Sequence, residues 1–156
     1  MRTALLLLAL LFATPALAQY WDHYSNARFG YEIDIPPGFV GNGESDNGDG
    51  QIFYNLESEQ SLTVWGSALL GDFEAMVAEA RMADERANWM LSEQASSPKW
   101  ASYAAQRDHR VIAERLILLC DGESYAAFRA EYNIRDLVKM DKVIEGLERS
   151  LEASAC

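Results

Sequence analysis

The sequence predicts an α/β domain of the α+β type, in which an antiparallel sheet is flanked by helices. Three patterns predict this fold class. Residues 31–35 (Tyr-Glu-Ile-Asp-Ile) alternate between apolar and acidic side chains, which is the period of a half-buried strand. Residues 72–88 change to a helical period, and the second half of the chain holds strand-like runs joined by short turns. We expect about seven strands, one internal helix and one C-terminal helix.

In the first half of the chain, Pro36-Pro37-Gly38 ends the strand at 31–35, because proline cannot donate to a sheet ladder. A polar loop is expected from Gly41 to Gly50. Residues 51–54 and 61–66 then predict an antiparallel hairpin joined by the polar turn 57–60. Asp72 follows Gly71 as an N-cap for a helix that runs to about Asn88.

In the second half, residues 89–94 predict a further strand before a break at 95–98. Residues 100–106, 111–120 and 124–132 predict a three-stranded meander, whose last turn holds the hairpin pair Asp121-Gly122. The final helix carries an apolar stripe from Leu137 to Leu151. Its start is open, since either Asn133 or Asp141 could cap it.

The first eighteen residues have the pattern of a secretory signal peptide. Arg2 supplies a positive charge, residues 4–13 form an apolar run, and a small-x-small cleavage signature ends at Ala18. The run is shorter than the roughly 20 residues that span a bilayer. We expect a mature chain that begins at Gln19 and does not insert into a membrane. It would be exported, to the periplasm of a Gram-negative bacterium and otherwise to the medium.

Residues 19–156 have the length of a single domain. The whole chain has 13 basic and 24 acidic residues, so removal of Arg2 leaves 12 basic residues and a formal charge of −12. Such a surface repels phosphate backbones and anionic lipid head groups, which argues against nucleic-acid binding. Divalent cations and basic protein surfaces are favoured partners, although the charge could serve solubility alone.

The chain has two cysteines, Cys120 and Cys156, and exported proteins usually pair such residues. A disulfide between them would fasten the C-terminus to the sheet. Closing a loop of about 37 residues is worth roughly 4 kcal/mol in the loop-entropy account. The alternative is that Cys156 stays free or pairs with another molecule.

The order of these segments resembles a known fold. The resemblance rests on residues 24–39 (Tyr-Ser-Asn-Ala-Arg-Phe-Gly-Tyr-Glu-Ile-Asp-Ile-Pro-Pro-Gly-Phe), 47–50 (Asn-Gly-Asp-Gly), 62–66 (Leu-Thr-Val-Trp-Gly) and the closing helix from Asp141 to Leu151. These segments are similar to those of small exported proteobacterial proteins of unknown function with a PsbP/Mog1-like fold. The resemblance covers essentially all of residues 19–156 and implies an accessory or partner-binding role by analogy of fold. The two cysteines are not part of the resemblance.

The acidic loop, residues 44–50 (Glu-Ser-Asp-Asn-Gly-Asp-Gly), is a candidate ion-binding site. An EF-hand requires a bidentate glutamate at the twelfth position, which here is Leu56, so that motif fails. A looser calcium site could use Glu44, Asp46 and Asp49. The competing interpretation is a tight turn, because Asn-Gly and Asp-Gly pairs supply the positive φ angles of a turn without any ion.

Catalytic motifs are weak throughout the sequence. It has no Gly-x-Ser-x-Gly elbow, and its two histidines, His23 and His109, have no ligand spacing with the cysteines that would suggest zinc. His109 is expected in a solvated turn. Glu32 and Asp34 alternate with the apolar face of their strand, so they are expected to face solvent rather than act as a glycosidase pair. A hydrolase with an unfamiliar site is the least favoured class.

Four tryptophans and seven tyrosines are many for one small domain, and exposed aromatic residues often mark recognition surfaces. Tyr20, Trp21 and Trp100 are therefore candidate contacts with a partner, although the first two could instead pin the first strand to the sheet. The sequence predicts a non-enzymatic accessory protein, without a cofactor, that recognises another protein through a sheet face or edge. The alternative is a small-ligand or calcium-binding module that uses the acidic loop.

Overall fold

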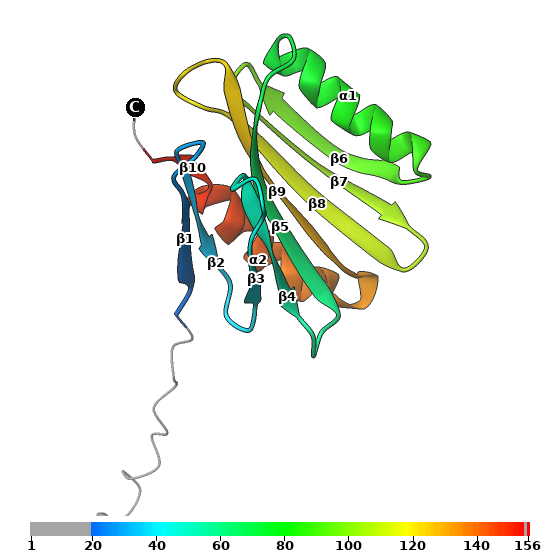
Figure 1. The fold of residues 1–156 in the computed structure, drawn as a ribbon. Helices are drawn as coiled ribbons and strands as arrows, with labels where there is room; N and C mark the ends of the chain where they lie inside the picture. The colour runs from blue at the N-terminus through cyan, green and yellow to red at the C-terminus, as the bar shows by residue number, and fades with distance from the viewer. Residues whose placement is uncertain (1–19, 155) are drawn as a thin grey trace, which may run out of the picture.

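The computed structural model describes residues 20–154 and 156. The predicted signal peptide lies outside these residues. The fold consists of a seven-stranded sheet, a three-stranded sheet and two α-helices, and every strand pairing is antiparallel (Figure 1). The predicted α+β fold class, with an antiparallel sheet flanked by helices, is confirmed.

The large sheet has the strand order β3-β4-β5-β9-β8-β7-β6. Its strands are β3 (Val40–Glu44), β4 (Gly50–Asn55), β5 (Gln60–Ala68), β6 (Met90–Ser97), β7 (Trp100–Arg107), β8 (Arg110–Leu118) and β9 (Ser124–Asn133). Successive hairpins link β6 through β9, as the predicted meander requires, and β9 pairs with β5 at the centre of the sheet. The sheet therefore has two edges, one at β3 and the other at β6.

The small sheet has the order β1-β2-β10 and consists of β1 (Asp22–Asn26), β2 (Tyr31–Ile35) and β10 (Glu152–Ala153). The predicted strand at 31–35 is confirmed, and its residues alternate between buried and half-buried as the sequence pattern requires. The two-residue strand β10 was not predicted. It ties the end of the chain to β2, opposite Tyr31 and Glu32.

The two helices cover opposite faces of the large sheet. Helix α1 (Phe73–Arg86) buries Phe73 and Val77 against alternate residues of β7, among them Tyr103. Helix α2 (Leu137–Ser150) buries Met140 and Leu147 on the other face, where the small sheet also packs. In Figure 1, α1 lies beside β6 and β7, whereas α2 lies near β2.

The helix N-caps test the predicted boundaries directly. Asp72 caps α1 as predicted, since its carboxylate accepts a hydrogen bond from the Ala75 amide at 2.7 Å. Asn133 caps a short 3₁₀ turn, Ile134–Asp136, and α2 begins directly after this turn. Asp141 lies inside α2, and the N-cap position of α2 is held by Asp136, whose side chain forms no capping hydrogen bond, so neither Asn133 nor Asp141 caps α2 itself.

Three predicted boundaries were wrong. The expected polar loop 41–50 begins with strand β3, because residues 40–44 pair with β4 through an irregular register. The expected break at 95–98 is only the turn at Pro98-Lys99, since β6 continues to Ser97 opposite Trp100. The strand predicted to reach Cys120 ends at Leu118.

The predicted disulfide is present, and the Cα atoms of Cys120 and Cys156 lie 5.3 Å apart. It joins the turn after β8 to the last residue of the chain. Within residues 20–154 and 156, no helix is long and apolar enough to cross a membrane.

Candidate functional site

A groove of about 600 Å³ lies between α2 and the β6–β9 part of the large sheet. We call it the α2 groove. Its apolar part is formed by Val111, Ala113, Tyr132 and Ile144. Val111 and Ala113 come from β8 and Tyr132 comes from β9, and all three side chains point to the face of the sheet that α2 covers. Ile144 comes from α2 itself. A ligand in this groove would therefore contact apolar side chains at its base.

The side chains that surround this apolar base are acidic. Glu93 of β6 lies on one side, and Asp141, Glu145 and Glu148 of α2 lie on the other. The three α2 residues share one helix face, because their spacing of four and three residues matches the helical repeat. No lysine or arginine is among the residues that line the groove in the described part of the chain.

These acids have few cationic partners. Glu148 approaches Arg115 at 4.0 Å, and Glu145 pairs with Arg149 at 3.8 Å on an exposed part of the helix. Among the residues that the structure describes, Glu93 and Asp141 form no ion pair. The negative charge of the groove is thus only partly neutralised.

Tyr132 provides a polar group at the base of the groove. Only 3% of this residue is exposed, yet its hydroxyl forms no hydrogen bond with any other described residue. Burial, together with the smaller effect of the nearby charges of Asp141 and Glu93, raises the pKa of Tyr132 to about 12. The hydroxyl therefore keeps its proton and can donate a hydrogen bond to a bound group.

Strand β6 forms the edge of the sheet beside the groove. It is eight residues long and pairs on one side with β7; within residues 20–154 no strand pairs with its other side. Six of its residues are exposed, including Met90, of which 68% is accessible. An edge of this length can accept a further strand, and its pairing with β7 has one irregularity of register, between Leu91 and Glu93. The opposite edge, β3, is shorter and has only three paired positions.

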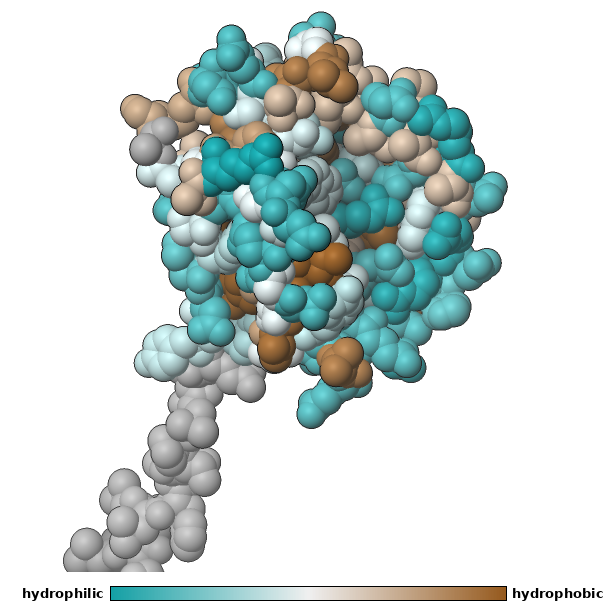
Figure 2. Space-filling view, viewed as in Figure 1, coloured by the Kyte–Doolittle hydropathy of each residue, from teal (hydrophilic) through white to brown (hydrophobic). Residues whose placement is uncertain are grey.

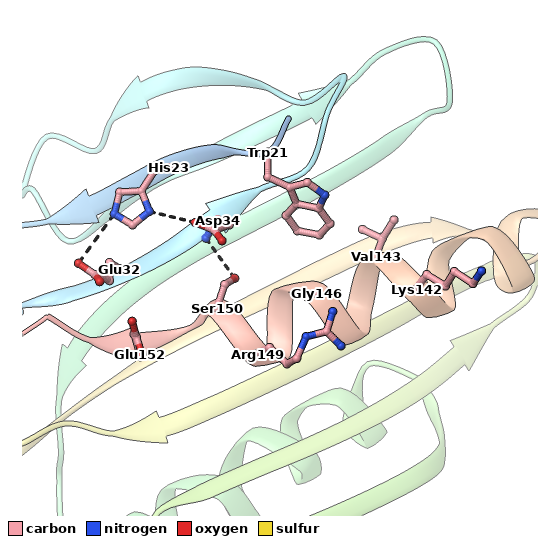
Figure 3. A pocket seen from close by; sticks show the side chains of 10 residues that line it. All are labelled: Trp21, His23, Glu32, Asp34, Lys142, Val143, Gly146, Arg149, Ser150 and Glu152. Carbon is pink, nitrogen blue, oxygen red and sulfur yellow. Dashed lines mark hydrogen bonds and ion pairs between the residues drawn. The ribbon is translucent and has the colours of Figure 1, made fainter. Parts of the chain in front are cut away.

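A second pocket, of about 800 Å³, lies between α2 and the small sheet and contains His23 (Figure 3). His23 of β1 sits opposite Asp34 of β2, and its Nδ1 lies 3.0 Å from the Asp34 carboxylate. Glu32 approaches the other ring nitrogen at 3.8 Å. Glu32 and Asp34 face away from the core, as the strand pattern predicts, but they contact His23, which the sequence did not predict.

The His23 pocket lacks a nucleophile beside the imidazole. The Ser150 hydroxyl accepts a hydrogen bond from the Asp34 amide at 3.1 Å and donates to the Leu147 carbonyl at 3.3 Å, so it is directed away from His23 (Figure 3). Both cysteines of the chain are in the disulfide. No described hydroxyl or thiol is hydrogen-bonded to the His23–Asp34 pair.

The acidic loop has an internal network of hydrogen bonds. The Ser45 hydroxyl donates to Asp49 at 2.6 Å, and the Asn47 amide donates to the other oxygen of the same carboxylate at 2.9 Å. These hydrogen bonds hold the pKa of Asp49 below its ordinary value, and the bond from Ser45 has the largest effect. Glu44 instead accepts hydrogen bonds from Tyr24 and Asn26.

The structure thus separates the three candidate ligands of this loop, since Glu44 and Asp49 belong to different networks. Asp46 forms no side-chain hydrogen bond with the described residues. Nor do the described residues include a group of three or more His, Cys, Asp or Glu side chains that could hold a metal ion. Calcium binding by the loop stays a prediction.

The three aromatic residues that the sequence singled out lie apart. Tyr20 is 87% exposed, and Trp21 packs its ring over Gly146 in the His23 pocket. Trp100 lies on the face of β7 that also contributes to the α2 groove, where it stacks with the Arg115 guanidinium at 4.6 Å. Only Trp100 is therefore close to the groove. His109 is exposed in the β7–β8 turn, as expected.

Sequence reasoning missed a buried ionic network under α1. The Arg129 guanidinium bridges Asp84 and Glu114, each at 2.9 Å, and the Tyr103 hydroxyl donates to Asp84 at 2.7 Å. Burial raises the pKa of Glu114, while the Arg129 charge opposes this rise. A signal was present: each of the two strand-like runs holds two charged residues, Glu114 and Arg115 in one and Arg129 and Glu131 in the other. A hairpin centred on Asp121-Gly122 places Glu114 opposite Arg129.

The face in Figure 2 is mostly hydrophilic, with hydrophobic residues in small separate groups. That face therefore offers no large apolar patch for docking. The α2 groove combines an apolar base, negative charge that is only partly neutralised and an adjacent open edge strand, and it is the strongest candidate site.

Comparison with known proteins identifies the fold. No family model matches the sequence, and no curated protein sequence matches it. Among solved structures, the chain is similar to cyanobacterial PsbP (CyanoP) from Synechocystis, with a TM-score of 0.61 and 13% identity over 89% of this chain and 95% of that one. It is also similar to the Ran-binding protein Mog1p of Saccharomyces cerevisiae, with a TM-score of 0.63 and 9% identity over 88% and 97% of the two chains. These likenesses show a PsbP/Mog1-like fold, as the sequence resemblance predicted.

Proposed function

We propose that this chain is an exported, non-enzymatic accessory protein that binds another protein through strand β6 and the sheet face beside it. The proposal is based mainly on strand β6. It is eight residues long, and within the described part of the chain no strand pairs with its outer side. An open edge offers backbone donors and acceptors to a partner strand, and side chains beside it add specificity.

The α2 groove supports the same surface, because Glu93 belongs both to β6 and to the groove. A partner strand added to β6 would pass beside this groove and could place side chains in it. Mog1p, which has the same fold, is described as Ran-binding. At 9% identity this likeness supports a binding role by analogy of fold alone.

Three further observations support export and a role other than catalysis. The first eighteen residues have the signal-peptide pattern, and a disulfide closes the C-terminus, which suits an oxidising compartment. The His23–Asp34 pair has no hydroxyl or thiol hydrogen-bonded to it among the described residues. The chemistry that such a pair usually activates is therefore not assembled in the pocket.

Site-directed photo-crosslinking in intact cells tests this proposal. A benzophenone amino acid replaces Met90 in β6, and in a second strain it replaces Leu56, which is 85% exposed in the β4–β5 turn. We expect a discrete protein adduct from position 90 and none from position 56. Adducts of equal yield and size at both positions, or no adduct at either position, would contradict the proposal.

A further inference from the structure

We propose that the α2 groove binds a basic amphipathic peptide segment, whose Lys or Arg side chains pair with the groove acids while an apolar side chain covers the base. This inference rests on the proposed function, since the segment would belong to the protein partner. It adds the chemistry of that partner, which the open edge of β6 does not specify.

The charges of α2 are sorted between its two sides. Asp141, Glu145 and Glu148 line the α2 groove, whereas Lys142 and Arg149 line the His23 pocket on the other side of the helix. Glu93 of β6 is the fourth carboxylate that lines the groove. The His23 pocket also contains acids, Glu32, Asp34 and Glu152, but there they share the lining with Lys142 and Arg149, whereas no described basic residue lines the α2 groove. A cationic ligand is therefore better complemented on the groove side.

The base of the groove favours a ligand with an apolar side chain rather than a bare cation. Val111 and Ala113 are buried, and Tyr132 of β9 lies directly opposite Val111 in the sheet. The Tyr132 hydroxyl, which has no hydrogen-bond partner among the described residues, could donate to a peptide carbonyl of the segment. Filling the base with an apolar side chain would shield these groups from water and strengthen the surrounding ion pairs.

The acids also set the spacing of the cations. Asp141 and Glu148 are seven residues apart on α2, which corresponds to about 10 Å along the helix axis. A helical segment with basic residues at positions i, i+4 and i+7 reproduces this spacing, and an extended segment reproduces it over about three residues. The formal net charge of −11 for the whole chain adds long-range attraction for a basic segment.

Peptide binding to the mature, disulfide-bonded protein tests the inference. The probe is a fluorescein-labelled twelve-residue peptide of Lys-Leu-Leu-Lys repeats, and binding is measured by fluorescence anisotropy at fixed ionic strength. The groove variant is Asp141→Asn/Glu145→Gln. The control variant is Glu57→Gln/Glu74→Gln, which removes the same charge from the β4–β5 turn and from α1.

We expect the groove variant to weaken binding about tenfold, as for loss of two close charge pairs, and the control variant to weaken it about twofold or less. Tyr132→Phe should weaken binding of the probe while leaving the fold intact. A matching peptide with serine in place of leucine should bind much less tightly. An equal loss in both charge variants, or equal binding of the serine peptide, would overturn the inference, because attraction to the whole acidic surface would then suffice.

The two proposals can fail separately. Crosslinks from position 90 without any difference between the charge variants would retain the edge strand as a binding surface and overturn the groove inference. A tenfold difference between the charge variants without crosslinks from position 90 would support the groove and contradict the use of β6.

Discussion

Gly48, in the turn before β4, and Gly50, the first residue of β4, are both required, but for different physical reasons. Gly48 has a φ of +69°, a conformation that side chains disfavour, and a Cβ at this position would meet no atom within 4 Å. Gly50 is buried and lies against the backbone of β5, so a Cβ there would collide with the Val64 carbonyl oxygen and with Cα of Trp65. The Asn-Gly-Asp-Gly pattern predicted a turn correctly, yet it could not show that the second glycine serves the close approach of two strands.

Gly50→Ala should therefore destabilise the protein more than Gly48→Ala. We expect a loss of about 3 kcal/mol for Gly50→Ala, because the β4–β5 ladder must move apart. Gly48→Ala should lose about 1 kcal/mol from backbone strain alone. Urea unfolding of the oxidised mature proteins measures both, and a larger loss for Gly48→Ala would contradict this account.

Arg129 is the residue on which the buried network under α1 depends. Replacement by methionine, Arg129→Met, leaves Glu114 and Asp84 without their cation, and we expect a loss of about 3–5 kcal/mol at neutral pH. Burial raises the pKa of Glu114 above its ordinary value of 4.5, and the variant also lacks the charge that opposed this rise. When the pKa of an acid is higher in the folded state than in the unfolded state, the protein loses stability as the pH rises from the unfolded-state pKa through the folded-state pKa.

The deficit of Arg129→Met should therefore be smallest at or below about pH 4.5 and should grow toward neutral pH. Urea unfolding of both proteins at several pH values measures this difference. Adding Glu114→Gln to the variant should recover part of the loss at neutral pH. A deficit independent of pH would show that the carboxyl group is not the cause.

Among the secondary-structure elements, the sequence predicted the paired strands and the helices better than the edges. The Asp121-Gly122 hairpin and the cap at Asp72 are local signals, and both were predicted correctly. Strand β6 has mostly exposed side chains and lacks a clear period of two, so its end was misjudged. Strand β3 contains two glycines and was taken for a loop. Edge strands bury few side chains, so hydrophobic periodicity carries little information about them.

The loop between β3 and β4 should hold its shape through Ser45. Ser45→Ala removes the hydrogen bond to Asp49 that lowers its pKa, and we expect a loss of about 1 kcal/mol at neutral pH. Because the pKa of Asp49 is lower in the folded state than its ordinary value of 3.8, the ionised carboxylate stabilises the fold at pH values above 3.8. This stabilisation is lost as the pH falls through the folded-state pKa. The difference from the parent should therefore shrink as the pH falls below about 4.

Urea unfolding near pH 7 and pH 3 measures this effect, and NMR titration of the Asp49 carboxyl group measures the pKa directly. Ser58→Ala, in the β4–β5 turn, is the matched control, since the Ser58 hydroxyl forms no hydrogen bond with the described residues. An unchanged pKa of Asp49 in Ser45→Ala would contradict the assignment.

At the scale of the whole molecule, the sequence predicted the fold class and the disulfide but not the placement of the candidate site. The α2 groove is assembled from β6 through β9 and from α2, so its acids become neighbours only after the meander has packed against the helix. With 24 acidic residues in the chain, no local pattern distinguishes these four from the rest. The His23 pocket was missed for the same reason, because it requires the pairing of β1 with β2.

The disulfide ties the last residue of the chain to the turn after β8. The double variant Cys120→Ser/Cys156→Ser should lose roughly 4 kcal/mol of stability by the loop-entropy account. Thermal unfolding of the oxidised parent and the double variant measures this loss. Thiol quantification of the denatured, unreduced parent should find no free thiol, and two free thiols per chain would contradict the bond.

The most direct test of the binding surface is amide hydrogen exchange of the mature protein, alone and bound to the partner captured through position 90. We expect slower exchange on binding in β6 and α2, with unchanged exchange in the acidic loop from Glu44 to Gly50. Slower exchange confined to that loop or to β1 and β2, with β6 and α2 unchanged, would show that the partner does not bind at the β6 edge and the α2 groove.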